Sequence, residues 1–184
     1  MKINADLTQR AVVNTNALPW IDSPMAGVQR RLLDRDGDEV ARATSLVRYA
    51  PGSYFSAHTH GGGEEFIVLE GVFSDEHGDF GPGTYVRNPV GSSHTPHSKD
   101  GATILVKLRQ MTPDDQQQVT IDTRRTDWGP GLVPGLQVLP LHSYGTEQVA
   151  LVNWAPGTQF QQHRHWGGEE IFVLDGTFAD EQGI

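Results

Sequence analysis

An internal repeat constrains the fold of this chain more than any other feature. Residues 49–78 read YAPGSYFSAHTHGGGEEFIVLEGVFSDEHG, and residues 154–183 read WAPGTQFQQHRHWGGEEIFVLDGTFADEQG. The two segments align without a gap and are identical at 17 of 30 positions, which shared composition alone does not produce. Similarity at this level predicts a chain built from two copies of one structural unit.

The repeat predicts how the chain is divided. We expect an N-terminal segment at 1–19, a first unit at 20–110, a linker at 111–127 and a second unit at 128–184. The linker is predicted because this stretch is polar and contains the run PDDQQQ near its start. The first unit continues for about thirty residues past Asp79, whereas the counterpart of Asp79 is Ile184, the last residue. We therefore expect the second copy to be incomplete.

The local pattern favours β-strands throughout. Strands are expected at 41–49, 65–70 (EFIVLE), 103–108 (TILVKL) and 148–154, because these runs are short and rich in branched residues. The 21 glycines and 11 prolines supply the turns between them, and no helical stripe exceeds two turns. This indicates an all-β sandwich or barrel. A plain all-β binding domain without a special site would share this pattern, and the histidines separate the two interpretations.

Composition excludes several classes of function. The chain has 23 acidic and 14 basic side chains, a net charge of -9, so we expect no nucleic-acid partner. It contains no cysteine, which excludes disulfides, thiolate metal sites and thiol nucleophiles. The first twenty residues lack the apolar core of a signal peptide, and no apolar run approaches the roughly 18 residues that cross a bilayer. We therefore expect a cytoplasmic protein that does not bind membranes.

Four residues of the first unit predict a metal site. His58 and His60 lie two positions apart, so on a strand both imidazoles face the same side. Glu64 follows three glycines that let the chain turn back sharply, and His94 comes from a later Pro- and Gly-rich turn. Imidazole and carboxylate ligands suit zinc, iron, manganese, nickel or copper, and no softer ligand is available.

The spacing of these residues resembles the two motifs of the cupin superfamily. The first motif is matched by Gly52, His58, His60, Glu64 and Gly71, and the second by Gly83, Pro89, Gly91 and His94. Ser98 stands where the second motif has Asn, a residue that does not bind the metal. The resemblance implies a double-stranded β-helix of the jelly-roll type, with the metal inside the barrel. Its ligands would be His58, His60, Glu64 and His94.

The second copy matches the first motif again, so the chain resembles a bicupin. The matching residues are Gly157, His163, His165, Glu169 and Gly176. His163, His165 and Glu169 are therefore candidate ligands of a second metal. The counterpart of His94 would fall at about position 199, because the two copies are offset by 105 residues (His58 to His163). The second site thus has three candidate ligands.

Each candidate carboxylate is one of a pair. Glu64 is followed by Glu65 and Glu169 by Glu170, which leaves a choice of ligand in both copies. The motif's spacing to the glycine that closes it favours Glu64 and Glu169.

Within the superfamily, the sequence resembles the cupin domain of ChrR-type anti-sigma factors. The runs that carry the likeness are HTHGGGEEFIVLEGVFSDEHG and GTYVRNPVGSSHTP. In that group the cupin is commonly a zinc-binding sensory or stabilising domain. Acetylacetone- and dihydroxyacetophenone-cleaving dioxygenases are similar cupins that hold iron. Anti-sigma members also carry a helical N-terminal domain with a His and Cys zinc site. This chain has no cysteine and its cupin begins near residue 20, which puts sigma-factor binding in doubt.

Three functions remain open, and whether the protein is an enzyme remains open with them. The first is a sensory or ligand-binding module with a three-His, one-Glu divalent metal site. The second is an iron dioxygenase acting on a small β-diketone or aromatic ketone. The third is a structural metal domain that mediates assembly. Zinc is the metal we expect, with iron, manganese or nickel as alternatives, and the ligand would be a small anionic or carbonyl compound.

Residues near the motifs give further expectations. Tyr85 and Arg87 share a strand face, so either one or both line the metal pocket, or Arg87 is exposed beside a core tyrosine. His77 and His142 lack a paired context and are expected at the surface.

The strand at 65–70 is apolar on both faces. Phe66 and Val68 lie on one side, and Ile67 and Leu69 on the other, where they need cover. We therefore predict a buried contact between the two units or a homodimer.

Overall fold

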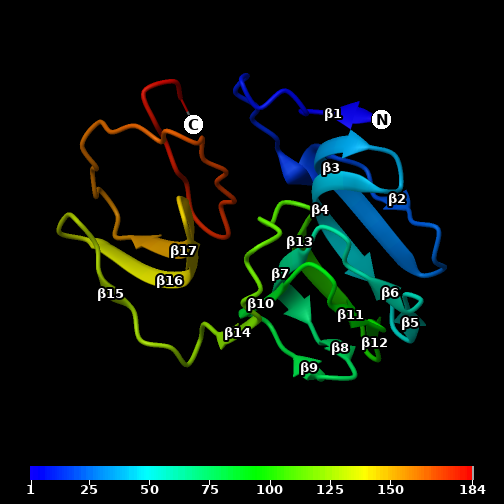
Figure 1. The fold of residues 1–184 in the computed structure, drawn as a ribbon. Helices are drawn as coiled ribbons and strands as arrows, with labels where there is room; N and C mark the ends of the chain where they lie inside the picture. The colour runs from blue at the N-terminus through cyan, green and yellow to red at the C-terminus, as the bar shows by residue number, and fades with distance from the viewer. Residues whose placement is uncertain (184) are drawn as a thin grey trace.

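The computed structural model describes residues 1–183, and its regular secondary structure is almost wholly antiparallel β-strand (Figure 1). Ile184, the last residue of the predicted second unit, lies outside the described residues. Within 1–183, regular helix is limited to a 3-10 turn at Thr15–Ala17, which confirms the all-β prediction. No helix in this range has the length and apolar character that crossing a membrane would require.

The first unit and the segment before it contain β1 (Lys2–Ile3), β2 (Ile21–Asp22), β3 (Val28–Gly37), β4 (Ala41–Tyr49), β5 (Ser53–Tyr54), β6 (His58–Thr59), β7 (Glu64–Gly71), β8 (Phe73–Asp75), β9 (Gly78–Phe80), β10 (Thr84–Asn88), β11 (Ser93–His94), β12 (His97–Ser98) and β13 (Ala102–Leu108). The rest of the chain contains β14 (Val119–Asp122), β15 (Gly129–Pro130), β16 (Leu136–Tyr144) and β17 (Glu147–Trp154). The strands expected at 41–49, 65–70, 103–108 and 148–154 are β4, β7, β13 and β17.

One large sheet organises the first unit. Its strand order is β1-β3-β4-β13-β7-β10-β14, with β2 added to β3. Strand β7 lies between β13 and β10, with Val68 opposite Ile104 and Phe66 opposite Val86. Because side chains alternate along a strand, one face of β7 turns into the barrel and the other turns out of it.

The hydrophobic core lies between this sheet and a smaller one of order β5-β12-β8-β9. The large sheet contributes Val28, Tyr49, Phe66, Val68, Val86, Ala102, Ile104 and Val106, and β8 and β9 contribute Phe73 and Phe80. Phe73 contacts Tyr49 edge-on, with ring centroids 5.4 Å apart, and Phe66 at 4.7 Å. Two packed antiparallel sheets around one core form the predicted cupin jelly roll.

A glycine turn places the predicted ligands beside one another. Between β6 and β7 the chain turns at Gly63, whose φ of 75° lies in the left-handed region that favours glycine. A Cβ atom at this position would collide with the side chain of Met111. The turn therefore brings His58 and His60 next to the start of β7, where Glu64 lies.

The second unit repeats the first hairpin of the fold. Strands β15, β16 and β17 form an antiparallel sheet in which Leu136 pairs with Trp154, as Val28 pairs with Tyr49 in the first unit. Residues 155–183 contain no strand apart from an isolated bridge between Asp180 and Gly183. Residues 169–176 match β7 in sequence. Among the described residues, no strands corresponding to β10 and β13 lie beside them, so their backbone forms no strand pairing.

The predicted linker is part of the first sheet. Strand β14 pairs with β10 at its edge, with Ile121 opposite Tyr85, and Asp115 is fully buried. Its side chains contribute to contacts between the units, as Asp115 does with His142.

The predicted contact between the units is present. The outward-facing Tyr85 of β10 packs with Leu139 and Leu141 of β16 in a second buried cluster. Ile67, on the outward face of β7, is only 9% exposed. The second unit therefore covers part of the outer face of the large sheet, beside which it lies in Figure 1.

Candidate metal centre

The four residues predicted as ligands in the first unit lie together at one end of the barrel. Strands β6 and β11 pair in a small sheet of their own, in which His58 lies opposite His94. His60 follows β6 directly, and Glu64 begins β7. Short strand pairing and the glycine turn therefore bring residues from positions 58 to 94 to one point.

The geometry is compact. The imidazole centroids are 4.9 Å apart for His58 and His60, 5.0 Å for His58 and His94, and 4.7 Å for His60 and His94. Oε2 of Glu64 is 3.5 Å from Nε2 of His60 and 3.4 Å from Nε2 of His94. One nitrogen or oxygen from each of the four side chains lies within 4.8 Å of the others.

The donor atoms fit a divalent metal ion. Nε2 of His60 and Nε2 of His94 are buried and have no hydrogen-bond partner among the described residues. Buried polar atoms are normally satisfied, so a pair of unpaired nitrogens beside a carboxylate needs an explanation. Nδ1 of His58 lies 2.8 Å from the Ser56 carbonyl oxygen, to which its N–H can donate, leaving Nε2 free. Neutral imidazole and carboxylate are ligands for zinc, iron, manganese and nickel.

Neighbouring groups hold two of these side chains in place. Nδ1 of His94 lies 3.0 Å from Oδ2 of Asp75, and Nδ2 of Asn88 donates to Oε2 of Glu64 at 3.3 Å. Because Asp75 accepts a hydrogen bond from Nδ1 of His94, the proton stays on Nδ1. The lone pair of Nε2 then faces the other side chains of the cluster. This outer layer was not foreseen from the sequence, although Asp75 lies within the repeated segment.

The pKa values of the buried imidazoles shift in opposite directions. Burial lowers the pKa of His60 below its ordinary value, outweighing the attraction of Glu64, and so favours the neutral form that can bind a metal. Burial alone would also lower the pKa of His94, but the hydrogen bond to Asp75 and the charge of Glu64 raise it.

The two carboxylates of the Glu pair face opposite sides of β7. Glu64 points to His60 and His94, whereas Glu65 accepts hydrogen bonds from Tyr85 and Arg87 on the outer face. The geometry therefore places Glu64, the residue that the motif spacing favours, beside the histidines.

The four side chains of the cluster differ in their exposure. His60, Glu64 and His94 are buried, while His58 is only half-buried and Phe55 packs edge-on against its ring at 5.4 Å. His58 is therefore the member of the cluster that is most exposed to solvent.

The candidate ligands of the second unit lie in a different setting. Nε2 of His163 is 2.7 Å from Nε2 of His165. Nε2 of His165 is in turn 3.3 Å from Oε1 of Glu169. The side chains of His165 and Glu169 are 40% and 44% exposed, on the strandless segment 155–183. In residues 1–183, two groups of at least three side chains have potential ligand atoms within 4.8 Å of one another. One is the first-unit set, and the other is Asp75, Glu76 and His77, so the second-unit residues do not form such a group. The second metal site stays a prediction.

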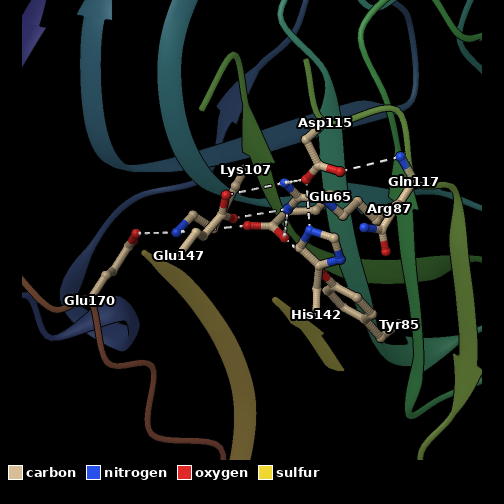
Figure 2. Close-up of polar contacts among 9 residues, drawn as sticks. All are labelled: Glu65, Tyr85, Arg87, Lys107, Asp115, Gln117, His142, Glu147 and Glu170. Carbon is tan, nitrogen blue, oxygen red and sulfur yellow. Dashed lines mark hydrogen bonds and ion pairs between the residues drawn. The ribbon is translucent and has the colours of Figure 1, made fainter. Parts of the chain in front are cut away.

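Tyr85 and Arg87 do not line the metal cluster, and Arg87 is not exposed, so both expectations for Arg87 were wrong. Figure 2 shows Arg87 in a polar network between the two units. Its guanidinium donates to Glu65 at 3.0 Å, to Asp115 at 2.8 Å and to Glu147 at 3.0 and 3.2 Å. These ion pairs outweigh burial and raise its pKa, so it stays charged.

His142, expected at the surface, is also buried in this network, whereas His77 is exposed as expected. Nε2 of His142 lies 2.7 Å from Oδ2 of Asp115. Lys107 extends the network to Glu170 at 2.8 Å. The sequence feature that could have indicated this network is the position of Arg87 on the outer face of a central strand. Its partners could not be identified in this way, because they come from distant segments of the sequence.

Comparison with known proteins places the chain. A family model described as the ChrR cupin-like domain matches residues 8–112 and 116–184. No curated protein sequence matches the chain.

Several solved structures share the fold. A candidate dioxygenase from Nostoc punctiforme is 16% identical, with a TM-score of 0.62 over 76% of this chain and 59% of that chain. A candidate glyoxylate-induced protein from Pseudomonas aeruginosa is 13% identical, with a TM-score of 0.57 over 75% and 60%. The anti-sigma factor ChrR of Rhodobacter sphaeroides, solved with SigE, is 24% identical, with a TM-score of 0.43 over 52% and 51%.

This chain therefore spans less than two thirds of the length of each of these three proteins. The family model covers both copies of the repeat, and the fold and the histidine cluster agree with it. The chain belongs to the ChrR cupin-like domain family of the cupin superfamily.

Proposed function

We propose that the first unit is a sensory or ligand-binding module that holds one divalent metal ion through His58, His60, Glu64 and His94. The observation that carries this proposal is the pair of buried Nε2 atoms, of His60 and His94, that face the Glu64 carboxylate without a hydrogen-bond partner. A metal ion is the partner that satisfies both nitrogens and the carboxylate together.

The proposed ligand is a small anionic or carbonyl compound. Three neutral imidazoles and one carboxylate leave a bound divalent ion with a local charge near +1, which attracts anions and polarises carbonyl oxygens. The half-buried edge at His58 supports access of such a molecule. Zinc is the metal we propose first, because four ligands of this kind can complete its tetrahedron, whereas iron, manganese or nickel would keep positions open.

A second candidate is an iron-dependent dioxygenase acting on a small β-diketone or aromatic ketone. The partial exposure of His58 favours it over a purely structural metal site, since a structural site is normally closed. The enolate of a β-diketone is an anion with two oxygens, which suits a metal that retains two free positions.

One experiment separates these functions. Metal-free protein is loaded with Zn(II) or, without oxygen, with Fe(II), and acetylacetone binding is measured by calorimetry. Oxygen uptake then follows on the iron-loaded form, with His94→Ala as the control. The proposal expects metal-dependent binding without uptake. Sustained uptake that His94→Ala abolishes would establish the dioxygenase instead, and a bound metal that recruits neither this ligand nor a panel of small carboxylates would indicate a structural role.

The same proposal includes the division of the chain into two units and a second metal site at His163, His165 and Glu169. It also includes a cytoplasmic location and a homodimer. Light scattering on the purified chain tests the homodimer directly, since a monomer at all concentrations would contradict it. Sigma-factor binding is not part of the proposal.

A further inference from the structure

A cavity of about 630 Å³ lies on the outer face of the large sheet, away from the metal cluster. It is bounded by that face, by the N-terminal segment around Trp20 and by Leu151 and Phe172 of the second unit. None of the four candidate metal ligands lines it. Cavities of this size at the boundary between two units are a common place for small ligands.

The floor of the cavity is apolar. Leu46 and Ile67 are 5% and 9% exposed, and Leu69 continues the same face of β7. Phe172 lines the cavity from the second unit. A ligand that rests here would bury hydrocarbon surface against these side chains, which favours an apolar body.

The wall of the cavity is cationic. Arg31, Arg48 and Arg124 line it, and Glu70 is the one acidic residue among its lining residues. Within residues 1–183, no carboxylate oxygen lies within 4.0 Å of any of these three guanidinium groups, whereas five other arginines of the chain form such pairs.

Two of these arginines are held in place by an aromatic ring. The guanidinium carbons of Arg31 and Arg48 lie 4.5 Å and 4.4 Å from the ring centroid of Trp20. Stacking restrains a guanidinium while leaving its N–H edge able to donate. Nη2 of Arg48 already donates to Oε1 of Gln29, and its other N–H groups have no carboxylate partner within residues 1–183. Nε of Arg31 is buried and has no hydrogen-bond partner among the described residues. A buried donor normally meets an acceptor, and a carboxylate bound in the cavity would supply one.

We propose that this cavity binds an organic carboxylate with an apolar body. The carboxylate would accept hydrogen bonds from Arg31 and Arg48, because a guanidinium matches the two oxygens of a carboxylate. The apolar body would lie on Leu46 and Ile67. The site is independent of the metal proposed for the first unit, because the two sites share no residue.

The test uses decanoate as the probe and calorimetry as the readout, on the full chain after metal removal with a chelator and again after loading with zinc. The expected result is one binding site with the same affinity in both forms. Decanol, which lacks the charge, and acetate, which lacks the apolar body, should each bind at least about tenfold more weakly. Binding that appears only with zinc would move the carboxylate to the metal and overturn the proposal, without affecting the metal site.

Variants locate the site. Replacing both Arg31→Gln and Arg48→Gln should weaken decanoate binding by about ten- to a hundredfold. Arg125→Gln is the matched control, because Arg125 is 88% exposed and is not among the lining residues. A Thr103→Trp variant keeps every charge but fills the cavity, and it should also block decanoate. Unchanged binding in either the double variant or Thr103→Trp, or many weak sites in place of one, would overturn the proposal.

Discussion

Glu64 and Glu65 are consecutive residues that serve opposite faces of the same strand. The carboxylate of Glu64 reaches within 3.5 Å of His60 inside the barrel, while that of Glu65 accepts a 2.6 Å hydrogen bond from Tyr85 outside it. On the neighbouring strand, Asn88 lies opposite Glu64 and Arg87 opposite Glu65. One strand pair therefore supports the candidate metal site on one face and the contact between the units on the other.

The two glutamates should respond differently to the same substitution. We expect Glu64→Gln to weaken zinc binding by more than the roughly 10–100-fold that loss of an outer partner costs, because it removes a direct ligand. Glu65→Gln should leave zinc affinity nearly unchanged and lower the unfolding temperature, because Arg87 loses a charged partner. Competition with a fluorescent chelator gives the affinities. Equal losses of zinc affinity in both variants would contradict the assignment.

Asp75 should act on the metal through His94. Asp75→Asn removes the charge that holds Nδ1–H of His94, so we expect zinc affinity to fall by about 10–100-fold while the stoichiometry at saturation is kept. Glu76→Gln is the matched control, because that carboxylate accepts from the backbone N–H of Thr95 and forms no hydrogen bond with His94 among the described residues. If both substitutions change zinc affinity to the same small extent, Asp75 does not position His94.

The Arg87 network should contribute strongly to the stability of the chain. Arg87→Ala leaves the buried carboxylates of Glu65 and Asp115 without their cation, and breaking a buried pair in this way typically costs about 3–5 kcal/mol. Denaturant unfolding measures the loss. Arg125→Ala, at an exposed pair with Asp122, should change stability little. Similar unfolding midpoints for both variants would show that the network does not hold the units together.

The same network predicts a loss of stability in acid. Burial alone would raise the pKa of Asp115, but hydrogen bonds from Gln117, Arg87 and His142 outweigh it and hold the pKa below its ordinary value. The folded state therefore favours the ionised form, and the stabilisation is complete above the ordinary carboxyl pKa. It should be lost as pH falls through the lowered pKa.

Unfolding curves recorded between neutral pH and about pH 3 test this, with Asp115→Asn as the comparison. The variant should be less stable at neutral pH, and its stability should fall less steeply in acid. Parallel pH profiles for the two proteins would count against a role for Asp115.

Much of the first unit could be predicted from the sequence because its signals are local. Strand β4 has the predicted bounds, and His58, His60 and Glu64 lie within seven residues, so strand parity and a glycine turn suffice to bring them together. His94 is more distant, and its position followed from the resemblance to a motif rather than from geometry.

The network between the units could not be predicted, because its members come from separate segments and none has a local signature. Asp115 lies in a polar run that is typical of linkers, and His142 has no second histidine nearby. Both are buried only because the outer face of β10 meets the second unit. In the second copy, the residues that repeat β7 form no strand, because a strand depends on neighbours that sequence similarity does not supply.

The most direct test of the account is the metal content of the protein, measured by mass spectrometry after purification without added metal or a metal-binding tag. The account predicts one tightly bound divalent ion per chain, zinc first, that is lost in His94→Ala and retained in His142→Ala, whose histidine lies in the Arg87 network. A second, weaker ion lost in His163→Ala would show that the second set also binds. No metal after reconstitution with zinc or iron, or a content that His94→Ala leaves unchanged, would contradict the central claim.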